Sequence, residues 1–163
     1  MKIYCVRHGH AEPLADATGD RPLTQDGIDE LKKVANYLAF RGFHVSHVMH
    51  SEKQRSKQTA EILAKQIATD TTPELCLLLS PDEPVDELVA RIRTWHDDTL
   101  LVGHMPNISS LVSALVIGDQ AQDLILFTPG TIVCLERNEN QSWIINWIVR
   151  PELVSNRFKA SDR

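Results

Sequence analysis

A histidine between an arginine and a glycine follows the first apolar run of this chain. Residues 2–6 have the composition of a buried strand, and Arg7, His8 and Gly9 come directly after it. Ligands of α/β sheets bind beyond the carboxyl ends of strands, where we expect these side chains to lie. Arginine offers a fixed fork of donors to phosphate oxygens, and a neutral imidazole is a nucleophile at physiological pH. The tripeptide therefore indicates phosphoryl chemistry, with a purely structural histidine as the alternative.

Two later segments supply groups of the same kind. Arg55 falls in the first turn of a predicted helix that follows a short strand and Ser51, where its guanidinium can reach an anion held by the helix N-terminus. His104 follows Gly103 at the end of another apolar run. Alone, the arginine could be a surface charge and the histidine a core residue. Because the ends of parallel strands share one edge of a sheet, we expect His8, Arg55 and His104 to converge.

The elements that must position these residues follow from the apolar spacing. Strands are predicted over residues 2–7, 45–50, 74–79, 99–102, 131–135 and 143–149. Helices are predicted over residues 24–42, with Thr24 as the cap and Gly42 as the stop, and over residues 53–67, 85–95 and 106–117. This order predicts an α/β fold, a three-layer sandwich whose largely parallel central sheet carries helices on both faces and ends in an antiparallel hairpin.

Composition limits the remaining possibilities. The 163 residues suit one domain, which we assign to residues 1–154, followed by a polar tail over residues 155–163 that we expect to fray. A net charge of −5 argues against general binding to nucleic acid, and no apolar run is long enough to span a membrane. Strand-like sequence starts at residue 2, where a secretory signal would lie. We expect a cytoplasmic monomer.

The three cysteines, Cys5, Cys76 and Cys134, are widely spaced, and each lies in an apolar, strand-like run. We expect them to be buried, reduced thiols and not disulfides or zinc ligands.

The chain resembles the histidine phosphatase superfamily, the phosphoglycerate mutase-like group. The matching motifs are residues 7–9, 21–24, 51–59 and 103–104, and they occur in the family's order over most of the chain. The short length and the runs Arg-Pro-Leu-Thr (21–24) and Gly-His-Met-Pro-Asn (103–107) are similar to those of the short phosphohistidine phosphatase branch, the SixA type.

The resemblance implies a mechanism. His8 would attack phosphorus and become a transient phosphohistidine, which water would hydrolyse to inorganic phosphate. A backbone carbonyl would fix its reactive tautomer, and Arg7, Arg55 and His104 would hold the phosphoryl oxygens. No metal or other cofactor is implied. Arg21 and Ser51 are further candidates for substrate binding, with a loop charge and a strand end as the alternatives.

A general acid is harder to identify. Asp82 and Glu83, in the loop after the third predicted strand, are the candidates, and ordinary loop charges are the alternative. An imidazole leaves phosphorus more easily than an alkoxide does, so a weak acid site fits phosphohistidine better than a sugar phosphate. The short stretches between motifs predict an open site, able to accept a phosphohistidine on a protein of the phosphorelay or phosphotransferase-system type.

Two other functions stay open. One is a small-molecule phosphomonoesterase or mutase of the same superfamily. The other is a non-catalytic module that binds phosphorylated proteins.

Catalysis needs a neutral His8, and we expect the two nearby arginines to lower the pKa of its imidazole.

Overall fold

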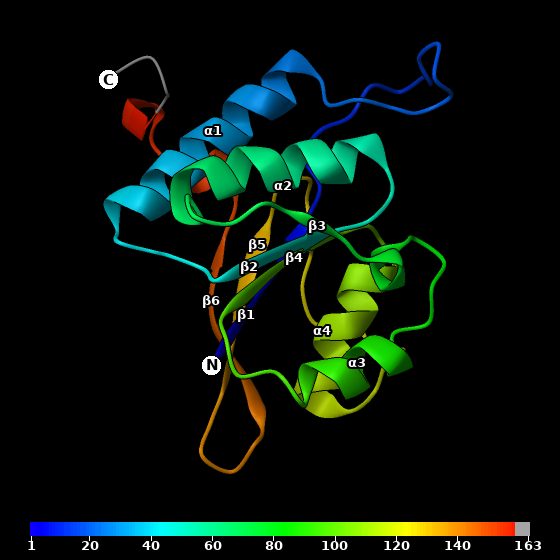
Figure 1. Cartoon of the computed structure of the whole chain (residues 1–163), viewed down its shortest axis with the longest axis vertical. Coiled ribbons are helices and arrows are strands. Elements are labelled where there is room, and N and C mark those ends of the chain that lie inside the picture. The colour runs from blue at the N-terminus through cyan, green and yellow to red at the C-terminus, as the bar shows by residue number, and fades with distance from the viewer. Residues whose placement is uncertain (159–163) are drawn as a thin grey trace.

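A six-stranded sheet forms the middle layer of the molecule (Figure 1). The computed structural model describes residues 1–158. The strands are β1 (Lys2–Arg7), β2 (His47–His50), β3 (Glu74–Leu75), β4 (Thr99–Gly103), β5 (Ile132–Arg137) and β6 (Trp143–Val149), in the spatial order β3-β2-β4-β1-β5-β6. The first four in this order are parallel, whereas β5 runs antiparallel to β1, and β6 to β5. The predicted parallel sheet and C-terminal hairpin are both confirmed.

Two pairs of helices cover the two faces of this sheet, as Figure 1 shows. Helices α1 (Gln25–Phe40) and α2 (Gln54–Ile67) lie on one face, and α3 (Asp86–Ile92) and α4 (Asn107–Ile117) lie on the other. Successive side chains of β1 enter opposite cores, because strand side chains alternate between faces: Ile3 packs on the α3–α4 side and Tyr4 on the α1–α2 side. The predicted three-layer fold is confirmed.

The predicted limits of α1 have a local cause. The Thr24 side chain accepts a hydrogen bond from the Gly27 backbone N–H at 3.0 Å, which satisfies one of the free donors at the helix start. The helix ends at Phe40, and Gly42 takes a φ of +76°, a conformation that glycine adopts at little cost.

The strand predicted over residues 74–79 is mostly wrong. Only Glu74 and Leu75 pair with β2, and Leu77–Leu79 form a turn of 3-10 helix. The partner strand β2 ends at His50, so the ladder has no partner beyond Leu75 at this edge of the sheet. Cys76 is therefore only half-buried and outside a strand, contrary to expectation, while Cys5 and Cys134 are buried free thiols as predicted.

The start of the C-terminal tail also differs from expectation. Residues Asn156–Phe158 form a helical turn, and the Phe158 ring packs against Tyr37 and Phe40 of α1. The Asn36 side chain donates a hydrogen bond to the Phe158 carbonyl at 2.9 Å. The prediction that the chain frays from Ser155 onward is thus wrong for residues 155–158. Residues 159–163 of the predicted tail lie outside the described part of the chain. Among residues 1–158, no helix is both long and apolar enough to cross a bilayer.

Candidate active site

The carboxyl ends of β1, β2 and β4 lie side by side and carry the candidate residues. Arg7 is in register with Gly103, and His50 with Val102. The residues that follow these strands, His8, Ser51 and His104, therefore meet at one edge of the sheet. The His8 backbone N–H donates to the Gly103 carbonyl at 3.1 Å, which joins the ends of β1 and β4 directly.

The His8 ring is buried and held in one tautomer. Its Nδ1 lies 2.7 Å from the Gly9 carbonyl, so Nδ1 carries the proton and donates it to this oxygen. The predicted hydrogen bond to a backbone carbonyl is confirmed. Nε2 keeps its lone pair, and the Arg55 Nε–H points at it from 3.4 Å. This nitrogen therefore carries the free lone pair of the ring.

Burial lowers the pKa of His8 to about 4, because the protonated ring loses its hydration. The hydrogen bond to Gly9 opposes the shift, and the guanidinium charges of Arg55, Arg7 and Arg21 add to it. The expected arginine effect is present, although burial is the larger cause. The imidazole is therefore neutral over the physiological range.

Arg55 is fixed by a carboxylate that the sequence analysis did not single out. The Asp20 carboxylate lies 3.5 Å from an Arg55 Nη1 and also accepts the backbone N–H groups of Gln54 and Arg21, each at 2.7 Å. Partial burial disfavours the charged form of Asp20, but these hydrogen bonds and the Arg55 charge outweigh it and lower its pKa. Asp20 thus ties the 21–24 motif to the start of α2. In the sequence, the position of Asp20 directly before the 21–24 motif is the one feature that could have indicated this role.

His104 is buried opposite His8, with the two ring centroids 5.0 Å apart. Its Nε2 lies 2.5 Å from the Ser51 hydroxyl, while its Nδ1 is buried and has no hydrogen-bond partner within residues 1–158. The pKa of His104 is lowered to about 3, mainly by burial and to a smaller extent by the neighbouring His8 and Arg55. A neutral His104 can present one N–H to an anion.

Arg7 directly precedes His8, and its charge acts on the His8 ring. One Nη1 donates to the Phe127 carbonyl at 2.6 Å, which fixes the guanidinium against the loop before β5. Its Nε is buried and has no hydrogen-bond partner among the described residues, and burial lowers the pKa of the guanidinium. A buried N–H without an acceptor is costly, and a bound phosphoryl oxygen would satisfy it.

Gly9 makes room for a neighbouring helix. Its φ is not positive, so it makes no glycine-specific turn. A Cβ at this position would lie 2.7 Å from Leu31 Cδ1, so the glycine allows α1 to pack closely on the end of β1. The Gly9 N–H also donates to Thr59 Oγ1 at 3.1 Å, and that hydroxyl donates to the Arg55 carbonyl at 2.8 Å. Thr59, at the end of the 51–59 motif, therefore fixes α2 against the His8 segment.

The remaining candidates are Arg21, Asp82 and Glu83. We call Arg7, His8, Arg55 and His104 the His8 cluster. Arg21 donates from Nε to the Glu12 carbonyl at 2.7 Å, and its charge acts on both His8 and Arg55. Asp82 and Glu83 are exposed in the loop before α3. Among the described residues, no hydrogen bond or ion pair joins either carboxylate to the cluster.

Glu52 is the second carboxylate, besides Asp20, whose charge acts on the cluster. It accepts a hydrogen bond from the Ser80 hydroxyl at 2.5 Å and pairs with Lys53 at 3.3 Å. Partial burial favours its neutral form, but these two partners outweigh burial and lower its pKa. Within residues 1–158, no group of three or more histidine, cysteine, aspartate or glutamate side chains is arranged to hold a metal ion.

Comparison with known proteins gives consistent matches. The model of the histidine phosphatase superfamily (branch 1) matches residues 3–76. An uncharacterized protein of Picosynechococcus is 33% identical over 138 residues, which are 81% of this chain and 83% of that protein. Phosphohistidine phosphatase SixA of Escherichia coli K12 is 26% identical over 155 residues, which are 93% of this chain and 94% of SixA.

Among solved structures, that of the protein histidine phosphatase SixA complexed with tungstate matches with a TM-score of 0.82 at 26% identity, covering 94% of this chain and 99% of that one. Proteins named phosphoglycerate mutases and α-ribazole phosphatases are also similar, over a smaller part of this chain or at lower identity.

Proposed function

We propose that this chain, which belongs to the histidine phosphatase superfamily and is similar to its SixA-type branch, hydrolyses phosphohistidine on another protein. The observation that carries the proposal is the state of His8. Its Nδ1 is held by the Gly9 carbonyl, its pKa is lowered to about 4, and its free Nε2 faces the Arg55 guanidinium. A neutral nucleophile beside a fixed cation is what attack on a phosphoryl dianion requires.

The reaction would have two steps. In the first, His8 Nε2 forms a bond to phosphorus while the bond from phosphorus to the substrate nitrogen breaks. The substrate imidazole, protonated at its other nitrogen, keeps the bonding pair and leaves neutral. In the second step, water attacks the phosphorylated His8, Nε2 recovers its lone pair, and dihydrogen phosphate leaves. Arg7, Arg55 and His104 would donate to the phosphoryl oxygens in both steps.

The substrate class is inferred from the carboxylates. Asp20 and Glu52 both have lowered pKa values, because hydrogen bonds and cations outweigh their partial burial. They are therefore ionised at neutral pH and poor donors of a proton to a leaving alkoxide. An imidazole leaving group has no such need. The exposed Asp82 and Glu83 are the remaining candidates for a general acid, and we infer that phosphohistidine hydrolysis does not depend on them.

The test uses a phosphotransfer protein carrying radiolabelled phosphohistidine. We expect the wild-type chain to release inorganic phosphate and His8→Ala to release none above the uncatalysed rate. His10→Ala is the matched control, since His10 is an exposed neighbour, and it should retain activity. A wild-type chain that leaves the label intact while hydrolysing a small phosphomonoester would favour the small-molecule phosphatase or mutase. Binding of the phosphoprotein without release by any variant would favour the non-catalytic module.

The double variant Asp82→Asn, Glu83→Gln separates the two catalytic alternatives. We expect it to keep its activity on phosphohistidine and to lose most of any activity on phosphomonoesters. An equal large loss on both substrates would show that one of these carboxylates is required for the main reaction.

A further inference from the structure

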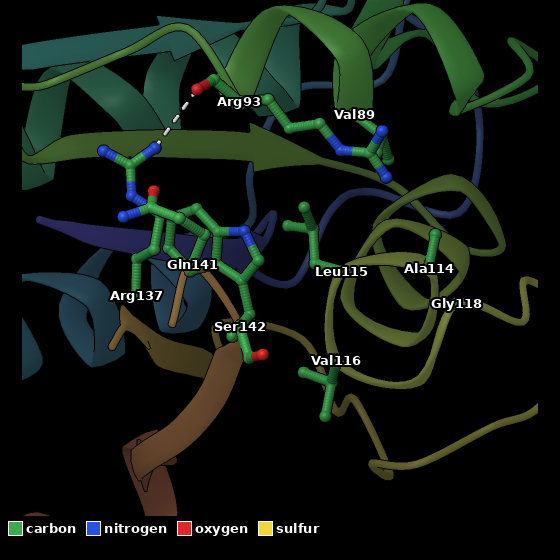
Figure 2. A pocket seen from close by; sticks show the side chains of 10 residues that line it. Val89, Arg93, Ala114, Leu115, Val116, Gly118, Arg137, Gln141 and Ser142 are labelled. Atoms are coloured by element: carbon green, nitrogen blue, oxygen red, sulfur yellow. Dashed lines mark hydrogen bonds between the residues drawn. The ribbon is translucent and has the colours of Figure 1, made fainter. Parts of the chain in front are cut away.

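A pocket lies far from His8, where α3 and α4 end against the β5–β6 hairpin (Figure 2). Its volume is about 530 Å³, within the range of small-molecule sites. Arg137 closes one side of it, at the end of β5, and its backbone N–H donates to the Met1 carbonyl at 3.1 Å. The pocket is therefore at the starting end of β1, whereas His8 follows the opposite end, about 23 Å along the strand direction from Met1 at 3.3 Å per residue.

The floor of the pocket is apolar. Val89 of α3, Leu115 of α4 and Trp143 of β6 line it, and all three side chains are buried. Only a small part of each side chain is exposed, so the apolar floor is narrow. An aromatic or aliphatic group of a ligand would pack on this floor.

The guanidinium of Arg137 is already held in place. It donates to the backbone carbonyls of Arg93 and Trp95, at 3.2 and 2.9 Å, and lies 5.7 Å from the centre of the Trp143 ring. Figure 2 shows the first of these hydrogen bonds at the edge of the pocket. These contacts fix a positive charge at the mouth of the pocket without neutralising it.

Arg93 supplies a second charge, and its side chain is free. Figure 2 shows it running across the pocket toward Val89. Within the described residues its guanidinium makes no hydrogen bond and no ion pair. Arg91, on the same helix, differs, because its guanidinium pairs with Glu87 at 2.6 Å and it does not line the pocket. Arg93 is therefore the cation available to a ligand.

The residues that line the pocket carry a net positive charge, even though the whole chain is acidic. The C-terminal ends of α3 and α4 each contribute a partial charge of about −0.5 at most. The two arginines contribute one full positive charge each, which exceeds the two helix ends together. A small anion is therefore attracted to this pocket.

We propose that this pocket binds a small organic anion, a carboxylate with an aromatic or aliphatic body. The body packs on Leu115 and Trp143, and the carboxylate pairs with the Arg93 guanidinium, whose fork of donors matches two oxygens. The site is separate from the His8 cluster, and the proposal does not depend on the reaction catalysed there.

The test is calorimetric titration of the full chain with sodium 2-naphthoate as the probe. We expect saturable one-to-one binding with a Kd of about 1 mM or tighter. Arg93→Gln should weaken binding about tenfold or more, because a charged hydrogen bond in a partly apolar pocket is lost. Arg91→Gln is the matched control on the same helix and should change the affinity less than about twofold.

Two further titrations exclude binding elsewhere. The neutral 2-naphthamide should bind about tenfold more weakly than the carboxylate, since it cannot form the ion pair. Ala114→Phe, which places a ring in the pocket, should abolish binding. The proposal is overturned by an absence of saturable binding, by equal effects of Arg93→Gln and Arg91→Gln, or by unchanged affinity in a folded Ala114→Phe variant.

Discussion

The Ser51 hydroxyl lies 2.5 Å from Nε2 of His104, and both side chains are buried at the ends of the neighbouring strands β2 and β4. In the part of the chain that the structure describes, the other ring nitrogen of His104, Nδ1, has no hydrogen-bond partner. Ser51 therefore provides the polar contact that orients this ring. We propose that Ser51 is a positioning residue. Its hydroxyl would hold the His104 ring until a phosphoryl oxygen replaces the hydroxyl as the partner of Nε2.

Ser51→Ala tests this role. We expect kcat/KM for the phosphohistidine protein to fall about three- to tenfold, the usual worth of one uncharged hydrogen bond. Ser109→Ala is the control, because Ser109 is also buried but donates to Asp123, away from the site, at 2.8 Å. A purely structural role would give both variants the same loss of activity and of thermal stability.

The convergence of His8 and His104 could be predicted from sequence because both depend on strand ends. Apolar runs that end in a polar residue identify a strand end, and parallel strands bring their ends to one edge. The loops and the edge of the sheet could not be predicted in the same way. Leu75 and Leu77 belong to an apolar run that favours a strand, yet β2 is too short to pair with it.

Asp20 and Gly9 show what local patterns miss at the site. Asp20 acts through backbone N–H groups at the start of α2, a contact between segments far apart in sequence. Gly9 is required by the proximity of Leu31, which only the packing of α1 on β1 determines. Both contacts depend on how helices and strands are placed relative to one another. The spacing of apolar residues along the sequence does not predict that placement.

We expect the activity to depend on an arginine at position 55, so that even a lysine there does not replace it fully. Its Nε faces His8 and one Nη1 faces Asp20, so one planar group serves both neighbours. We expect Arg55→Ala to lower kcat about 10² to 10³-fold, as for loss of one preorganised donor, and Arg55→Lys to recover only part of this. Lys57→Ala is the control on the same helix, since Lys57 is exposed and pairs with Glu61. Full activity in Arg55→Lys would mean that charge alone matters.

The pKa of His8, lowered to about 4 mainly by burial, sets the expected pH dependence. A histidine with a lowered pKa stays neutral above that pKa and loses its nucleophilic form only as pH falls through it. Attack by His8 should therefore persist well below the ordinary histidine pKa of about 6.5. An NMR titration of the His8 ring protons, assigned with His8→Ala, measures this directly. A midpoint near 6.5 would contradict the burial argument.

Gly27 provides a test of packing at the start of α1. In an exposed helix interior, Gly→Ala stabilises by about 1 kcal/mol. Here a Cβ would lie 2.4 Å from the His10 carbonyl oxygen, which the Thr24 backbone N–H also holds at 2.9 Å. The carbonyl cannot move without loss of that hydrogen bond. We expect Gly27→Ala to lower the free energy of unfolding by about 1 to 3 kcal/mol, measured by urea denaturation. Lys32→Ala, at an exposed position of the same helix, should change it by less than about 0.5 kcal/mol. Stabilisation by Gly27→Ala would mean that α1 can shift away from the His10 segment, and that the close contact is not required by the fold.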